Sequence, residues 1–451
     1  MNDTIVAIST ALGVGAISII RVSGNESIEI VNKIFKGTNL NEVPTHTINY
    51  GHIIDKEKII DEVLISVMKS PKTFTMEDIV EINCHGGIAT TNKVLELLLS
   101  NGCRLAEPGE FTKRAFLNGR IDLIEAEGII DLINAKTDQA RNLAMNQVEG
   151  KISKLIRDLR QQIIEILANI EVNIDYPEYE DIEELTVNLL NPKIQLIKES
   201  IRNILNESEN GKLIKEGIKT AIVGRPNVGK SSILNKLIDE EKAIVTDIEG
   251  TTRDTVEGTL NLDGVILNII DTAGIRQTQD VVEKIGVTKS LELIEKADLI
   301  LLVLNNNQEL TNEDKEILSK IKNKNYITII NKIDLESKLD TSILDGENII
   351  YMSVINDRGV NELKKKIKEI FNLEQITTKD LTYLTNARSI SILKKCLNTI
   401  EEIDREMIKN SPIDMIEIDI KYVWTLLGEI TGETYEEELI DQLFSQFCLG
   451  K

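Results

Sequence analysis

Hydrophobic residues change their spacing along the chain, and each change predicts a different kind of structure. In the first 120 residues, short runs rich in β-branched residues are separated by glycines, as in TIVAIS, GAISIIRVSG, DEVLISVMKS and DIVEINCHGG. Such runs, bounded by turn residues, are typical of strands. Residues 1–120 are therefore predicted to form a compact α+β domain.

From residue 121, apolar residues recur every three or four positions, which is the spacing of one face of an amphipathic helix. The longest stripe consists of Ile152, Leu155, Ile156, Leu159, Ile163, Leu167 and Ile170. Pro177 interrupts it, and a second helical pattern, NLLNPKIQLIKESIRNILNES, follows. Helical patterns return after residue 375. Residues 121–214 and 376–451 are predicted to be the two parts of one all-α domain.

The segment between these parts, residues 215–375, has a third pattern. The buried-strand runs KTAIVG, VILNIID, DLILLVLN and YITIINKID alternate with helical stretches, which is typical of a parallel α/β sheet. We predict an α/β domain inserted into the helical domain, an arrangement that is tolerated because the two ends of a domain often lie close together. The predicted fold class is multidomain, with α+β, all-α and α/β parts.

Composition narrows the class of protein. The chain of 451 residues is 41% hydrophobic and 28% charged, as expected for a soluble globular protein. No apolar run reaches the length of a membrane span, and the N-terminus carries an acid where a signal peptide would carry positive charge. Cys84, Cys103, Cys396 and Cys448 form no C-x-x-C pair, so neither a zinc site nor a disulfide framework is indicated. A cytoplasmic protein without a membrane partner is expected.

The charge balance is strongly acidic. The 52 Lys and Arg residues against 74 Asp and Glu residues give a net charge of −22. This argues against broad, non-specific binding of nucleic acid, which depends on neutralising phosphates. A local basic patch, or nucleic-acid binding through a partner protein, stays open.

A phosphate-binding loop is predicted at residues 224–231, GRPNVGKS, between the strand pattern TAIV and the helical pattern SILNKLI. Its glycines let consecutive backbone N–H groups and a helix N-terminus face phosphate oxygens. Lys230 is predicted to reach the β- and γ-phosphates, and the Ser231 hydroxyl to bind Mg²⁺. The GTP-binding residues predicted here are Asn227, Val228, Gly229, Lys230, Ser231 and Ser232.

Two further motifs predict the loops that sense the γ-phosphate. GTTRD, at 250–254, offers Thr252 as a second magnesium ligand, and DTAG, at 271–274, offers Asp271 to hold Mg²⁺ through water and Gly274 to bind the γ-phosphate. The GTP-binding residues predicted in and near these motifs are Thr246, Thr251, Thr252, Asp271, Thr272, Ala273 and Gly274.

The base-recognition motif NKID, at 331–334, completes the set. The carboxylate of Asp334 can accept both donors of the guanine edge, which adenine lacks, so it specifies GTP. Asn331 and Lys332 are predicted to brace the base and the loop, and Ser353 to lie in the last base-contacting loop. Four motifs in this order predict a Ras-like GTPase.

Activation of the attacking water is less standard. Ile275 follows DTAG, where a Ras-like enzyme carries glutamine, and its side chain cannot orient water. Asn227, with backbone carbonyls from the TDIEGTT loop, could instead hold a K⁺ ion that supplies positive charge. Glu283 could position water, or could be a solvated acid on a helix.

The whole chain resembles the tRNA modification GTPase family known as MnmE or TrmE. The blocks that carry the resemblance are GVGAISIIRVSG, KTFTMEDIVEINCHGG, PGEFTKRAFLNGRIDLIEAEGIIDLI, the four GTPase motifs and the terminal FCLGK. The resemblance implies an N-terminal domain that binds a one-carbon tetrahydrofolate, 5,10-methylene- or 5-formyl-tetrahydrofolate, and forms a homodimer. It implies modification of carbon 5 of the wobble uridine of certain tRNAs, together with the flavoprotein MnmG.

Matching positions carry the family's residue roles. The potassium ligands implied are Asn227, Thr246, Ile248 and Thr251, and Glu283 matches the water-positioning acid. The folate contacts implied are Arg21, Glu81, Arg120 and Lys451, because cations suit the glutamate tail and a carboxylate suits the pterin donors. Glu107 stands where the family usually has arginine.

The terminal SQFCLGK has the form of a prenylation box, but Gly450 is not aliphatic and no basic cluster precedes it. The resemblance implies that the tail lies beside the folate pocket, where Cys448 is either a thiol nucleophile or a structural residue. A ribosome-assembly GTPase is the alternative function, for which a basic RNA-binding domain would be expected. A scaffold GTPase would leave the N-terminal domain and the tail without a role.

Overall fold

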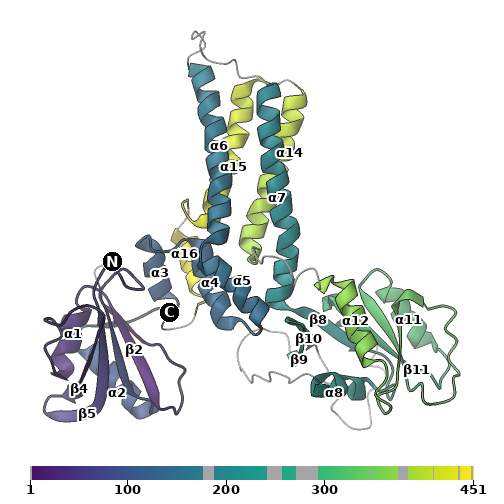
Figure 1. Cartoon of the computed structure of the whole chain (residues 1–451), viewed down its shortest axis with the longest axis horizontal. Coiled ribbons are helices and arrows are strands. Elements are labelled where there is room, and N and C mark those ends of the chain that lie inside the picture. Colours follow the sequence, from purple (N-terminus) through teal and green to yellow (C-terminus); the bar gives the residue numbers. More distant parts are fainter. Residues whose placement is uncertain are drawn as a thin grey trace. The chain divides into compact units, whose positions relative to one another are not determined.

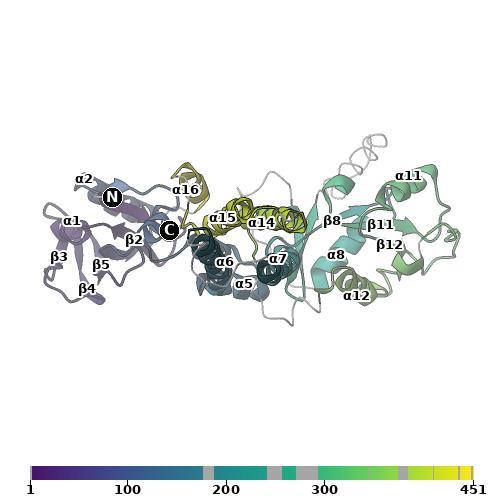
Figure 2. The ribbon, with the colours of Figure 1, turned by 90° about the horizontal axis from the view of Figure 1, so that it is seen from above.

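The structure is a computed structural model that describes residues 3–175, 187–240, 256–270, 293–344, 346–373, 384–409, 411–434, 437–447 and 450. These residues form two compact units, drawn in Figures 1 and 2. The first contains residues 1–130, 147–199 and 391–451, and the second contains residues 131–146 and 200–390. The predicted combination of α+β, all-α and α/β parts is confirmed.

The first unit begins with a seven-stranded sheet of order β3-β4-β5-β6-β2-β1-β7. The strands are β1 (Ile5–Ile8), β2 (Ile17–Ser23), β3 (Phe35–Gly37), β4 (Thr47–Asp55), β5 (Lys58–Met68), β6 (Ile79–His85) and β7 (Arg104–Leu105). Helices α1 (Ser27–Ile34) and α2 (Ile88–Ser100) complete the domain. Strand alternation places Ile20, Val22, Val80 and Ile82 in one buried cluster. Arg21 and Glu81, which pair across β2 and β6, therefore lie on the other face.

The rest of this unit is helical. Its helices, three of which extend into the second unit, are α3 (Glu110–Leu117), α4 (Leu123–Asn134), α6 (Lys151–Asp175), α7 (Val187–Glu216), α14 (Ala387–Ile408), α15 (Ile413–Thr431) and α16 (Glu437–Phe444). The stripe predicted along α6 is buried except Leu155, which is half-buried. Helices α6 and α15 lie side by side in both views (Figures 1 and 2). An ion pair between Lys198 and Asp404 joins α7 to α14.

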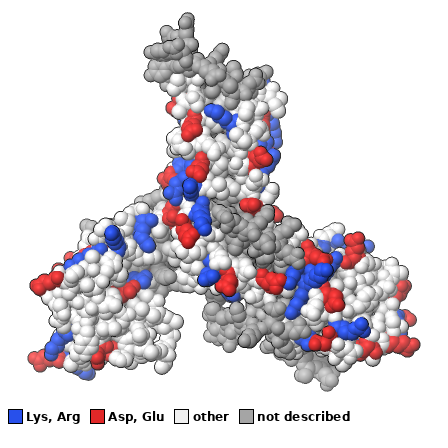
Figure 3. All heavy atoms as spheres, viewed as in Figure 1, with Lys and Arg blue, Asp and Glu red and all other residues white. Residues whose placement is uncertain are grey.

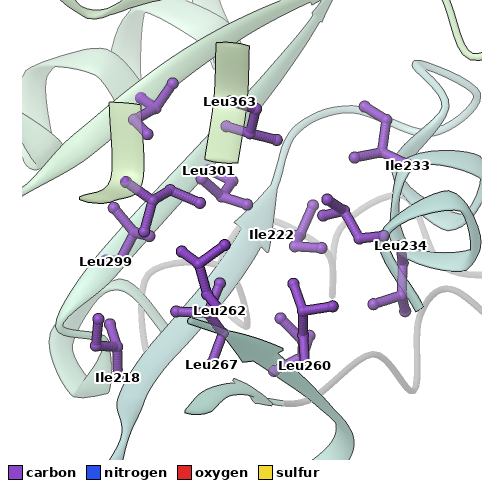
Figure 4. Close-up of a cluster of buried hydrophobic side chains, with 14 of the residues drawn as sticks. Ile218, Ile222, Ile233, Leu234, Leu260, Leu262, Leu267, Leu299, Leu301 and Leu363 are labelled. Carbon is purple, nitrogen blue, oxygen red and sulfur yellow. The ribbon is translucent and has the colours of Figure 1, made fainter. Parts of the chain in front are cut away.

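The second unit contains a six-stranded sheet of order β13-β12-β11-β8-β10-β9. The strands are β8 (Ile218–Val223), β9 (Val256–Leu262), β10 (Val265–Ile270), β11 (Leu299–Asn305), β12 (Tyr326–Asn331) and β13 (Ile349–Met352). All neighbouring strands are parallel except β9 and β10. Helices α5 (Asp138–Val148), α8 (Lys230–Glu240), α11 (Asn312–Ile321) and α12 (Val360–Ile370) and the 3-10 turn η1 (Gly346–Asn348) accompany it. Figure 4 shows one of its buried cores.

The end of the described chain returns to the N-terminal sheet. Phe444 and Phe447 pack with Phe116 of α3 in one buried cluster. Beyond them Gly450 is buried beside Ser9, which follows β1. Gly450 and the segment after β1 therefore meet within the first unit. Among the described residues, no helix combines the length and the apolar character needed to cross a membrane.

Candidate functional site

The phosphate loop joins the end of β8 to the start of α8, in the strand–loop–helix arrangement that the motif requires. Gly229 has a φ of +103°, and a Cβ there would lie 2.2 Å from Nδ2 of Asn331. Asn227 also adopts a left-handed conformation, with a φ of 62°. The loop therefore needs glycine at its last turn, and it presents the N-terminus of α8 toward the space where phosphate would bind.

Lys230 closes the loop on itself. Its Nζ donates to the backbone oxygens of Gly224, at 2.6 Å, and Arg225, at 2.7 Å. Burial lowers the pKa of Lys230 to about 8. When a nucleotide binds, its phosphate oxygens would replace the two carbonyl oxygens as acceptors for the Lys230 ammonium group. Ser231 and Ser232 occupy the first turn of α8.

The NKID loop is bonded directly to the phosphate loop. Nδ2 of Asn331, which is 3% exposed, donates to the oxygen of Val228 at 2.9 Å. Nζ of Lys332 donates to the oxygen of Asn227 at 2.8 Å. These two bonds connect segments more than 100 residues apart. They fix the distance between the phosphate region and the base region.

The guanine-reading carboxylate is oriented by a second loop. Ser353 follows β13, and its Oγ donates to Oδ1 of Asp334 at 2.6 Å. Asp334 is exposed, so its other carboxylate oxygen is open to a base. The structure thus brings Asp334 and Ser353 together, with the Ser353 hydroxyl holding the carboxylate.

Arg225 and Asp314 form an ion pair that the sequence analysis missed. Nε of Arg225 lies 2.9 and 3.1 Å from the two carboxylate oxygens of Asp314, which is fully buried. Asp314 also forms a capping box with Thr311 at the start of α11. The pattern Thr311-x-x-Asp314 was the available signal, because Ser or Thr followed three residues later by an acid marks a helix start. The pair anchors the first half of the phosphate loop to α11.

Several predicted residues lie outside the part of the chain that the structure describes. They are Thr246, Ile248, Thr251, Thr252, Asp271, Thr272, Ala273, Gly274, Glu283, Cys448 and Lys451. Their roles remain predictions. The strands beside the two γ-phosphate loops are described: β9 begins at Val256 and β10 ends at Ile270.

A second site lies on the N-terminal sheet. Arg21 and Glu81 form an ion pair, with Nε and one terminal nitrogen of Arg21 at 2.9 and 2.8 Å from Oε1 of Glu81. The guanidinium of Arg21 lies 5.7 Å from the ring centroids of both Phe74 and Phe111. Arg120 lies 4.9 Å from the Phe74 ring and donates to the Phe74 oxygen at 2.9 Å. Two predicted folate residues, Arg21 and Arg120, thus lie against Phe74, an aromatic residue that sequence reasoning did not select, and the third, Glu81, is linked to them through its ion pair with Arg21.

The C-terminal tail reaches this site through Gly450. Its carbonyl oxygen accepts from Oγ of Ser9 at 3.2 Å and from a terminal nitrogen of Arg21 at 3.4 Å. Gly450 has a φ of +91°, and a Cβ there would lie 2.5 Å from the oxygen of Ile8. Only glycine fits at this position without displacing the neighbouring backbone. The tail is therefore in contact with Arg21.

A buried ion-pair network supports the same region. Arg114 of α3 is 1% exposed and pairs with Asp3, Glu77 and Glu110, at distances of 2.8 to 3.1 Å. Glu77 lies three residues after Phe74, so this network also fixes the segment that carries the ring. Glu107 is exposed, and nothing in the structure explains glutamate in place of the family's usual arginine.

The described cysteines are poor nucleophiles. Cys84, Cys103 and Cys396 are buried. Burial raises the pKa of Cys103 and of Cys396 to about 12, so both stay protonated at neutral pH. Among the described residues, no group of three or more His, Cys, Asp or Glu side chains is arranged to hold a metal ion. The described part of the chain therefore offers a phosphate loop, a guanine-recognition motif and a cluster of charged and aromatic side chains around Arg21.

Comparison with known proteins accounts for the full length. The family profile of the MnmE helical domain matches residues 123–448, and that of the GTP-binding protein TrmE N-terminus matches residues 4–120. The tRNA modification GTPase MnmE of Bacillus thuringiensis (strain Al Hakam) is 56% identical over 455 residues, covering 100% of this chain and 99% of the relative. MnmE of Bacillus anthracis has the same identity and coverage. The solved G domain of FeoB from Methanococcus jannaschii covers 34% of this chain at 22% identity, with a TM-score of 0.25, too low to bear on the assignment. The chain belongs to the MnmE family of tRNA modification GTPases.

Proposed function

We propose that this chain is a potassium-activated GTPase that works with the flavoprotein MnmG on certain tRNAs. Together they add an aminomethyl or carboxymethylaminomethyl group to carbon 5 of the wobble uridine, using 5,10-methylene- or 5-formyl-tetrahydrofolate as the bound one-carbon cofactor. The observation that carries this proposal is the contact of Gly450 with Arg21 in its ion pair with Glu81, because it joins the tail to a charged aromatic pocket.

The pocket suits a folate by its chemistry. Glu81 can accept from the amino and N–H donors of a pterin, and the half-buried Phe74 ring offers flat apolar surface. Arg120, together with the predicted contact Lys451, suits the carboxylates of the glutamate tail. Arg21 and Glu81 are about one-fifth exposed, so a ligand can reach them in a partly dehydrated setting. When bound, the folate supplies the one-carbon unit.

The nucleotide site suits GTP with Mg²⁺. Ser231 and the predicted Thr252 would bind the ion, and Asp271 would hold it through water. Mg²⁺ would neutralise charge that develops on the phosphates. Lys230 would neutralise further charge, and Asp334 would select guanine. Glu283 would orient the attacking water.

The potassium part of the proposal rests on Asn227. Its side chain is exposed at the corner of the phosphate loop, and its backbone is held by Lys332. An amide oxygen is a suitable ligand for a hard cation. With carbonyls of Thr246, Ile248 and Thr251, Asn227 would hold K⁺, whose charge would replace the arginine that other GTPases insert.

The partners follow from the same proposal. Ile48, Tyr50 and Leu64 expose 70, 60 and 47% of their surface on neighbouring strands β4 and β5, which supports a homodimer formed through the N-terminal domains. On the face shown in Figure 3, cationic and anionic side chains of the described residues lie intermixed. This supports MnmG as the partner that carries much of the tRNA affinity, within the cytoplasm where tRNA is modified.

Potassium is expected to accelerate GTP hydrolysis at least about tenfold over sodium at equal ionic strength, since it adds positive charge beside the transferred phosphoryl group. Asn227→Ala should remove this difference, while Asn235→Ala, on the exposed side of α8, should keep it. The measurement is the steady-state rate of phosphate release in each salt. With MnmG, tRNA and methylene-tetrahydrofolate added, the yield of modified nucleoside should follow the hydrolysis rate. Equal hydrolysis in both salts would refute potassium activation, and full modification without hydrolysis would refute the coupling.

A further inference from the structure

Strands β9 and β10 form a hairpin whose two ends lead into the loops predicted to sense the γ-phosphate. β9 begins at Val256, two residues after the GTTRD motif, and β10 ends at Ile270, directly before DTAG. Because the backbone is continuous, a shift of this hairpin moves the point where the first loop ends and the point where the second loop begins. Whatever holds the hairpin therefore influences the geometry at the phosphates.

The hairpin has a tight turn at its far end. Leu262 pairs with Val265, so Asp263 and Gly264 are the two turn residues, with φ angles of 49° and 94°. Positive φ at both positions is typical of a type I′ turn, which matches the twist of the flanking strands. The N–H of Gly264 donates to Oδ1 of Asn261 at 2.8 Å. The turn is thus a defined, rigid feature of the strand pair.

Helix α5 holds this turn, although the two contacting residues are 124 positions apart in the sequence. Nε2 of Gln139 donates to the oxygen of Asp263 at 3.3 Å. The Gln139 carboxamide also fills the space beside Gly264, where a Cβ would lie only 1.9 Å from it. Lys368 of α12 pairs with the Asp263 carboxylate from another side. The turn is held by two elements.

Leu143 continues the contact one helical turn along α5. It is 2% exposed and belongs to the same buried cluster as Leu260, Leu262 and Val265 of the hairpin. Figure 4 shows Leu260 and Leu262 within that cluster. Residues 139 and 143 are four apart, so they lie on one face of the helix. Because this contact removes apolar surface of both α5 and the hairpin from water, it helps to fix the hairpin's position.

Helix α4, which precedes α5, contacts the two chain segments that connect the α/β sheet to the rest of the chain. The Asp131 carboxylate, near the end of α4, pairs with Lys215 at 2.7 Å and accepts from Thr385 at 3.0 Å. Lys215 precedes β8 by three residues, and Thr385 lies just before α14. The backbone oxygen of Glu216 in turn accepts from Asn268 of β10 at 2.7 Å. The corner formed by α4 and α5 is thus bound to the hairpin and to both chain connections.

We propose that α5 is a positioning element for GTP hydrolysis. Gln139 and Leu143 set the position of the β9–β10 hairpin, and through it the two loops that sense the γ-phosphate. This inference rests on the proposed GTPase function and adds residues that lie outside the nucleotide motifs. Lys230 follows β8, Asn331 ends β12 and Asp334 follows it, so these residues are placed by strands other than β9 and β10. Nucleotide affinity should therefore depend little on α5, while turnover depends on it.

The test compares Leu143→Ala with Ile321→Ala in the full chain. Ile321, at the end of α11, is fully buried in a different cluster of the α/β fold, so its truncation controls for a loss of core packing without loosening either element that holds the turn. We expect Leu143→Ala to lower kcat about tenfold, since small misplacements of reacting groups are costly, and to change GDP affinity less than about twofold. Ile321→Ala should keep kcat near the wild-type value. Leu143→Met, which preserves volume, should restore it.

Two results would overturn the inference. One is a wild-type kcat for Leu143→Ala, and the other is an equal loss of kcat in both alanine variants at matched thermal stability. Gln139→Ala gives a milder check, because it removes the bond to Asp263 without opening the core, and about a threefold loss of kcat is expected. Absence of GTP hydrolysis by the wild-type chain would instead refute the proposed function, so the two failures are distinguishable.

Discussion

Replacing Asp334 with asparagine should weaken GTP binding at least about a hundredfold. The carboxylate can accept two hydrogen bonds from guanine, and each bond to a charged group is worth about 1.5–3 kcal/mol. Asparagine presents an amide NH₂ toward a base donor, so one bond is lost and one repulsive contact is created. A total loss of about 3 kcal/mol or more corresponds to a factor above a hundred in Kd.

The fold should survive this substitution. Oδ1 of the asparagine can still accept from Ser353, which holds the side chain at 2.6 Å in the wild type. Xanthosine triphosphate, which carries a carbonyl in place of the guanine amino group, should bind the variant better than GTP does. Asp340→Asn is a matched control, because Asp340 is exposed in a nearby loop and bonds the N–H of Ser342. Titration with fluorescent nucleotides measures the binding of GTP and xanthosine triphosphate to Asp334→Asn and the binding of GTP to Asp340→Asn. A wild-type GTP affinity for Asp334→Asn would contradict the base-reading role.

Gly450→Ala should weaken binding of 5-formyl-tetrahydrofolate about tenfold or more. The new Cβ would lie 2.5 Å from the oxygen of Ile8, and alanine resists a φ of +91°. Residue 450 would be displaced, and Arg21 and Ser9 would lose its carbonyl oxygen as a hydrogen-bond acceptor. If displacing the tail costs about 1.4 kcal/mol of binding free energy, the affinity for the folate falls tenfold.

The control for this prediction separates backbone strain from the clash. Gly102 has a φ of +114°, but a Cβ there would meet only the end of Ile30 at 3.8 Å, an ordinary contact. Gly102→Ala should therefore leave folate affinity unchanged. Calorimetric titration of both variants compares them directly. If Gly450→Ala binds folate as the wild type does, the tail is a neighbour of the pocket and not part of it.

Local patterns could be predicted well from the sequence. The phosphate loop, its strand and its helix are contiguous, so the spacing of GRPNVGKS predicts them together. Fully buried strands such as β11 can be predicted because both of their faces are apolar. The buried stripe along α6 can be predicted because the helical periodicity repeats over 25 residues. Only Leu155, at the margin of that stripe, is less buried than expected.

Contacts between distant segments could not be predicted in this way. The bonds from Asn331 and Lys332 to the phosphate loop need the neighbouring positions of β8, β11 and β12 in the sheet, which no local pattern specifies. Arg225 resembles any exposed loop cation in sequence, and its buried partner is 89 residues away. Asp263 and Gly264 predict a turn, but not that α5 binds it.

The N-terminal site combines both kinds of information. Family resemblance selected Arg21, Glu81 and Arg120, and the register of β2 and β6 explains why the first two meet. Phe74 was missed because single aromatic residues in a domain of this kind are usually core residues, as Phe111 is. The contact between Ser9 and Gly450 spans 441 residues, so no local pattern specifies it, although the family resemblance implies a tail beside this site.

The measurement that tests the central claim most directly is calorimetric titration of 5-formyl-tetrahydrofolate into the full chain. Saturable binding with one site per chain is expected. Glu81→Gln should weaken it about tenfold or more, because the pterin donors lose a charged acceptor. Glu57→Gln, in the exposed turn between β4 and β5, should bind as the wild type does. No binding by the folded wild-type chain, or equal binding by both variants, would contradict the assignment of the Arg21–Glu81 pocket to a one-carbon folate.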